Sequence, residues 1–196
     1  MTRARSICEV VHIAALGFWL GALVLAGTAA AIIFPTMRDL EPHLPRYSAY
    51  TGEHWLIAGG SVAARVFWFT DAVQFACVLL AGLTFGIAVM WCGLPIRRAS
   101  TFLRSLILLS LIGLLSYRLG FVEPGLSSAL RNHWAAALAG DNAAATRLKA
   151  VFDAGHPLQT RLMAITAGLV LCAIAAVIGS FWNGDEPAKN SGERRQ

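Results

Sequence analysis

Histidine is the side chain of this sequence with the widest capacity for chemistry, because imidazole binds metal ions and exchanges protons near neutral pH. The chain has five histidines. Four of them stand in segments between apolar runs, with carboxylates nearby in the sequence: His43, His54, His133 and His156. Imidazole together with carboxylate suits zinc, copper or iron. No two of the four stand three or four residues apart, so a metal site and ordinary polar residues both stay open as interpretations.

A haem held by two histidines is a further alternative for these residues. It would need His12 and His156 to lie at the same depth in their helices. The apolar runs instead place them at opposite ends of helices about 30 Å long, which argues against a shared iron. His156 also precedes Pro157, and proline is favoured at the first position of a helix. We therefore favour a role for His156 at the start of a helix, and a functional role stays open.

A second group of candidates consists of polar side chains inside apolar runs. Asp71 and Gln74 follow the start of the second run, Arg118 is near the end of the third, and Arg161 is near the start of the fourth. Ionisable residues in apolar spans are costly, usually paired and often functional. We expect these residues to form a buried cluster that binds an anion or fixes the bundle. Separate extension of each side chain to the membrane surface is the alternative.

Four long apolar runs must position all of these candidates. The sequence is 57% hydrophobic and 14% charged, whereas an average soluble domain is about 25% charged. A helix that crosses a membrane needs about 20 mostly apolar residues, and four segments have that length: 10–34, 66–93, 102–122 and 157–182. The sequence therefore predicts an all-α integral membrane protein, with a four-transmembrane-helix bundle as its single domain over residues 1–182.

Prolines and an alanine-rich segment define the expected ends of these spans. Pro35, Pro95 and Pro124 are expected to end the first three spans, and Pro157 to start the fourth. Between the third and fourth spans, residues 125–154 predict one or two amphipathic helices, which lie against the membrane surface or pack on the bundle. Within that segment Gly140 marks a division, and Asp141-Asn142 is expected to cap the second piece. Residues 183–196 predict a disordered tail.

Basic residues indicate the orientation in the membrane, because lysine and arginine favour cytoplasmic segments. The N-terminal segment, the short second loop and the tail hold many of them: Arg3, Arg5, Arg97, Arg98, Arg104, Lys189, Arg194 and Arg195. In a four-span protein these segments share one side, so both termini are expected in the cytoplasm and the other loops outside a bacterial inner membrane. The expected partners are the lipid bilayer and other membrane subunits or a second copy, and no nucleic-acid motif is present.

Two GxxxG motifs add a packing signal. Gly17 and Gly21 form the first, and Gly82 and Gly86 form the second. This spacing lets helix backbones approach closely. We expect packing within the bundle, with dimerisation as the second interpretation.

Three segments resemble a known family: HIAALGFWLGALVLAGTAAAIIFPTM, VEPGLSSALRNHWAA and RLKAVFDAGHPLQTRL. Together they are similar to the bacterial membrane family called domain of unknown function 4149, which is related to eukaryotic transmembrane protein 205. The resemblance covers most of residues 8–182 and implies the four-span architecture, but no settled activity. The family usually has leucine where Gly155 stands and a small or polar residue where Pro157 stands. The first segment also faintly resembles copper-resistance membrane proteins of the D type, which have more spans.

The sequence leaves three functional hypotheses. The first is a small non-enzymatic accessory or complex-forming membrane subunit. The second is a metal- or haem-handling protein that uses the four histidines outside the spans. The third is a small transporter-like unit that acts as an oligomer through the Asp71 cluster. No nucleophile and base stand in a catalytic pattern, so an enzyme is not expected, and no cofactor is the expectation under the first hypothesis.

Overall fold

The computed structural model describes residues 3–96 and 98–182, and its regular structure there is entirely helical. The elements in chain order are α1 (Arg3–Leu40), η1 (Pro45–Tyr47), α2 (His54–Met90), α3 (Ala99–Tyr117), η2 (Arg118–Val122), α4 (Glu123–Leu138) and α5 (Asn142–Trp182). Four helical stretches are long and apolar enough to cross a membrane: Arg3–Leu40, His54–Met90, Ala99–Leu138 and Asn142–Ser180. The all-α class and the four apolar helices are therefore confirmed. The predicted disorder of residues 183–196 lies outside the described residues.

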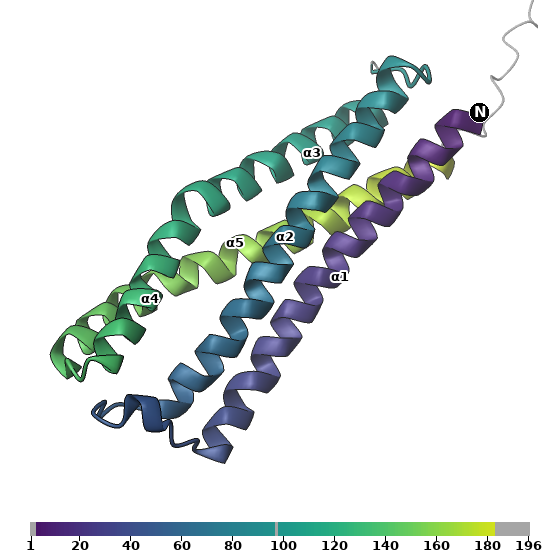
Figure 1. Cartoon of the computed structure of the whole chain (residues 1–196). Coiled ribbons are helices and arrows are strands. Elements are labelled where there is room, and N and C mark those ends of the chain that lie inside the picture. The colour runs from purple at the N-terminus through teal and green to yellow at the C-terminus, as the bar shows by residue number, and fades with distance from the viewer. Residues whose placement is uncertain (1–2, 97, 183–196) are drawn as a thin grey trace, which may run out of the picture.

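The long helices form an elongated bundle with two distinct ends (Figure 1). One end holds the start of α1, the α2–α3 connection and the end of α5, and we call it the terminus end. The other end holds the α1–α2 connection and the α4–α5 turn, and we call it the loop end. Side chains from all four long helical stretches meet in one core, where Leu16, Trp19, Leu111, Val170 and Val177 are fully buried.

The helices are longer than the predicted spans. The α5 helix has 41 residues, which corresponds to about 60 Å at 1.5 Å per residue. The hydrocarbon core of a bilayer is about 30 Å thick, so each long helix has room to extend beyond it.

Two prolines lie inside helices, where the sequence predicted helix boundaries. Pro35 is inside α1 and Pro157 is inside α5, so neither ends nor starts its helix. An internal proline removes only one backbone hydrogen bond, and neighbouring helices stabilise the turn around it. His156 consequently lies within a continuous helix, and the helix-start role predicted for it is wrong.

The third span also continues past its predicted end. The chain passes from α3 into α4 through η2, which is a π-helical turn, and Pro124 occupies the first turn of α4, where proline is well tolerated. The predicted division at Gly140 is confirmed, because Gly140 has φ +75° between α4 and α5. The predicted cap is confirmed as well, since Ala144 N donates to Asp141 Oδ1 at 2.9 Å. Residues 125–154 thus form most of α4 and the first part of α5, which pack against each other.

The second helix begins earlier than the predicted span, at His54, and two adjacent glycines in its added part, Gly59 and Gly60, are packing positions. A Cβ on Gly59 would lie 3.2 Å from the Phe34 ring, and a Cβ on Gly60 would lie 3.5 Å from the Trp134 ring. These glycines let α2 lie close to the side chains of α1 and α4.

Candidate functional site

The strongest candidate site is an ion pair between α2 and the π-helical turn. Arg118 Nη2 donates to Asp71 Oδ1, and the Arg118 side chain is 1% exposed. Gln74 Nε2 donates to the same Asp71 oxygen at 3.0 Å, and Trp19 Nε1 donates to Gln74 Oε1 at 3.0 Å. The structure therefore joins three of the four predicted cluster residues and adds Trp19 of α1, which sequence reasoning did not include.

Arg161 is the predicted member that the structure leaves out. Its side chain is exposed on α5, and within the described residues it makes no hydrogen bond or ion pair. Its neighbour Leu162 faces the interior instead. Successive residues on a helix point about 100° apart, so Leu162 and Arg161 cannot share a face. The predicted cluster of Asp71, Arg118 and Arg161 is therefore wrong in its third member.

The Asp71–Arg118 pair is only partly satisfied. The Arg118 Nε atom is buried and has no hydrogen-bond partner among the described residues. The Asp71 side chain is 15% exposed, and both of its hydrogen bonds within the described part of the chain reach Oδ1. Buried polar groups are nearly always satisfied, so the buried Nε of Arg118 is an exception to that rule. The adjacent π-helical turn is also a feature found often at functional sites.

A second buried ion pair, which sequence reasoning missed, joins Arg104 to Glu9 through two hydrogen bonds, and Arg104 Nε is likewise buried without a partner among the described residues. Arg104 of α3 donates to both carboxylate oxygens of Glu9 in α1, at 3.0 and 2.6 Å, and each side chain is 3% exposed. The guanidinium also lies over the Phe85 ring, 5.4 Å from its centroid. A two-bonded arginine–carboxylate pair fixes geometry strongly. Glu9 was missed because the first span was taken to begin one residue after it.

The histidine set is divided between the loop end and the exposed surface of α5. His43, His54 and His133 gather at the loop end around Tyr50: the His43 and His54 rings stack at 5.3 Å, and Tyr50 contacts both His54 and His133. His156 stands apart on the exposed surface of α5, stacked on Phe152. This separation removes His156 from the predicted set of four.

Hydrogen bonds occupy both ring nitrogens of His54 and one of His133. His54 Nδ1 accepts from Leu44 N at 3.0 Å, and His54 Nε2 donates to Tyr50 O at 3.2 Å. His133 Nδ1 donates to Ala145 O at 2.9 Å. Across residues 3–96 and 98–182, no group of three or more His, Cys, Asp or Glu residues lies close enough together to hold a metal ion. His12, buried in α1, donates in the same way to Ala81 O at 3.0 Å.

Removing the His54 imidazole is expected to loosen residues 41–53, because Leu44 N then loses the ring nitrogen that accepts its hydrogen bond. In His54→Ala, amide exchange at Leu44 should accelerate about fivefold, the scale of one net hydrogen bond.

Hydrogen exchange with mass spectrometry measures this effect. His156→Ala is the control and should behave as the unmodified chain, because its ring is exposed on α5. An unchanged protection of Leu44 in His54→Ala would contradict the expectation.

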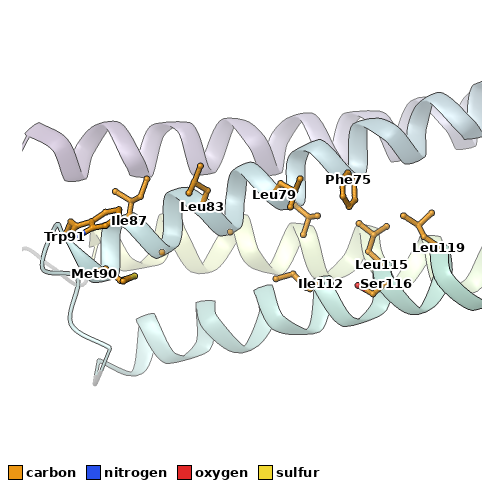
Figure 2. Close-up of a pocket in the computed structure, with 13 residues that line it drawn as sticks. Phe75, Leu79, Leu83, Ile87, Met90, Trp91, Ile112, Leu115, Ser116 and Leu119 are labelled. Atoms are coloured by element: carbon orange, nitrogen blue, oxygen red, sulfur yellow. The ribbon is translucent and has the colours of Figure 1, made fainter.

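A groove runs between α2 and α3 (Figure 2). Its volume is about 710 Å³, and it follows α2 from Phe75 to Trp91, a distance of about 24 Å. Across from α2 its wall consists of four residues of α3 and η2, Ile112, Leu115, Ser116 and Leu119. Phe75 lies one helical turn from Asp71, and Leu119 follows Arg118, so the ion pair stands at the loop end of the groove.

The GxxxG glycines do not mediate close helix contacts in this chain. A Cβ on any of the four would meet no atom within 4 Å outside its own helix backbone: Gly17, Gly21, Gly82 and Gly86. Gly82 and Gly86 instead line the groove. Packing within the bundle is therefore not their role. A glycine that does hold two helices together is Gly155, where a Cβ would lie 2.7 Å from Leu126 Cδ2 of α4.

Comparisons of the chain with protein-family models, with curated proteins and with solved structures found no match.

Proposed function

We propose that this chain is a small, non-enzymatic, complex-forming subunit of a bacterial inner membrane, and that a transmembrane helix of a partner protein fills the α2–α3 groove. The observation that carries the proposal is the groove itself, whose lining is apolar apart from Ser116. Two buried ion pairs fix the positions of its walls: Glu9–Arg104 joins α3 to α1 towards the terminus end, and Asp71–Arg118 joins η2 to α2 at the loop end.

The length and the glycines of the groove favour a helix as its occupant. The α2 wall of the groove, about 24 Å long, is longer than one leaflet of the hydrocarbon core, which is about 15 Å, although α3 and η2 line the opposite side only over residues 112–119. A single lipid chain would leave part of it empty, whereas a transmembrane helix crosses both leaflets. Gly82 and Gly86 lie on the groove with open space at their Cβ positions, and small residues at this spacing let a second backbone approach closely.

Replacing Gly86 with leucine is expected to abolish complex formation, because the new side chain would fill the groove. Gly17→Leu is the matched control: it stands in the other GxxxG motif, has equally open space and lies outside the groove. Native mass spectrometry of the chain, released from native nanodiscs, should show a constant added protein mass for the unmodified chain and Gly17→Leu. Gly86→Leu should show the single chain. Loss of the added mass from Gly17→Leu, but not from Gly86→Leu, would move the interface away from the groove.

The distribution of charge supports an orientation with both termini in the cytoplasm. The terminus end carries Arg3, Arg5 and Arg98, as short cytoplasmic segments do. In this orientation α4 and the first part of α5 extend outside the membrane. We keep membership of the family called domain of unknown function 4149 within the proposal, on the three similar segments.

A second candidate function is a small transporter-like unit. The observation that favours it is the incompletely satisfied Asp71–Arg118 pair, since intramembrane carboxylate–arginine pairs often lie on ion or substrate pathways.

A further inference from the structure

A smaller pocket lies towards the loop end, away from the groove. Its volume is about 300 Å³. Four residues of α2 line one side at helical spacing, Ser61, Ala64, Arg65 and Trp68, and Trp134 of α4 closes the other side. We call it the Arg65 pocket.

The Arg65 pocket presents hydrogen-bond donors and no acidic side chain. In the part of the chain that the structure describes, the Arg65 guanidinium and the indole nitrogens of Trp68 and Trp134 make no hydrogen bond, ion pair or cation–π contact. The Ser61 hydroxyl already donates to Ala58 O at 2.8 Å. The three available groups are all donors, and the guanidinium adds a positive charge, so the pocket matches an anion with several acceptor oxygens.

The position of the pocket along α2 places it at the level of lipid headgroups. Arg65 immediately precedes the apolar run 66–93, and Trp68 is 74% exposed at the start of that run. Tryptophan is enriched at the membrane–water interface, and arginine at this depth faces the phosphates of the nearer leaflet. The exposed Trp68 and Phe69 beside the pocket suit contact with acyl chains.

We propose that the Arg65 pocket binds the phosphate group of an anionic membrane lipid in the leaflet at the loop end. The planar guanidinium pairs with two phosphate oxygens, and the two indole N–H groups donate to the phosphate or to the polar headgroup. The Arg65 pocket is separate from the α2–α3 groove, so the lipid site does not depend on the proposed partner helix.

Native mass spectrometry with phosphatidylglycerol tests this site on the full chain in detergent. Arg65→Gln should weaken the tightest bound phosphatidylglycerol about tenfold, the scale of one charge-assisted hydrogen bond. Arg161→Gln is the matched control, because Arg161 is also an exposed arginine near the start of a predicted apolar span, has no partner among residues 3–96 and 98–182, and does not line the Arg65 pocket. It should change the affinity less than twofold. Arg65→Lys keeps the positive charge but loses the planar guanidinium that bonds two phosphate oxygens. Its affinity for phosphatidylglycerol should therefore lie between those of the unmodified chain and Arg65→Gln.

Three results would overturn the proposal. The first is an equal loss of phosphatidylglycerol in Arg65→Gln and Arg161→Gln. The second is displacement of the lipid by millimolar inorganic phosphate, which would assign the pocket to a free anion. The third is tighter binding of phosphatidylcholine by Arg65→Gln, which would mean that the two indoles hold a quaternary ammonium group.

Discussion

Replacing Arg104 with methionine is expected to destabilise the folded chain by about 3–5 kcal/mol, because it leaves the Glu9 carboxylate buried without its partner. Both carboxylate oxygens of Glu9 accept from Arg104, and both side chains are almost completely buried. The loss therefore includes the full cost of an uncompensated charge. Unfolding in mixed micelles of increasing SDS content measures it, with the intrinsic tryptophan fluorescence as the signal.

The double variant Glu9→Leu/Arg104→Met is the control for this prediction. Removing both charges leaves an apolar contact of similar size, so most of the lost stability should return. Arg161→Met, an exposed arginine without a described partner, should change the stability by less than about 0.5 kcal/mol. Equal effects of Arg104→Met and Arg161→Met would show that the Glu9–Arg104 pair is not buried in the folded protein.

Replacing Asp71 with leucine is expected to cost a similar amount, about 3–5 kcal/mol, because Arg118 is 1% exposed and would keep an unpaired positive charge. Asp71→Asn should cost less, about 1–3 kcal/mol, because the amide oxygen still accepts hydrogen bonds from Arg118 and Gln74. The same unfolding measurement ranks the two variants. The double variant Asp71→Leu/Arg118→Met should recover most of the loss.

The difference in stability between Asp71→Leu and Asp71→Asn shows whether Asp71 is the partner of a buried Arg118. If Asp71→Leu and Asp71→Asn were equally and weakly destabilising, Arg118 would have another partner or access to water. If the chain is a transporter-like unit, Asp71→Asn should also stop substrate movement while the fold stays intact.

The sequence predicted the depth of the polar residues better than their direction. Asp71 and Arg118 both stand near the loop end of apolar runs, and their pairing followed from that depth. Arg161 has the same depth, but it faces away from the interior, and the face of a helix depends on which neighbours pack against it. The sequence pattern of α5 could not supply that information, because Pro157 was taken as its start.

The predicted helix boundaries and the predicted packing role of the GxxxG glycines were wrong for a related reason. Proline and glycine are local signals of helix ends, but tertiary contacts decide whether a helix continues. Pro35 and Pro157 are held within helices by packing, and Gly59-Gly60 allows close contact within a helix. The GxxxG motif, by contrast, indicates only that the backbone of a second helix can approach closely. In the part of the chain that the structure describes, no second helix lies within 4 Å of a Cβ placed on Gly82 or Gly86.

A photo-crosslinking amino acid placed in the α2–α3 groove tests whether a transmembrane helix of a partner protein fills it. It would replace Leu79, which lines the groove and is 58% exposed, or Leu109 of α3, which is 66% exposed and lies outside it. In native membranes, we expect one discrete protein adduct from position 79, none from position 109, and loss of the adduct when Gly86→Leu is added. Adducts to lipid alone at position 79, or the same protein adduct from both positions, would contradict the assignment of the groove to a partner helix.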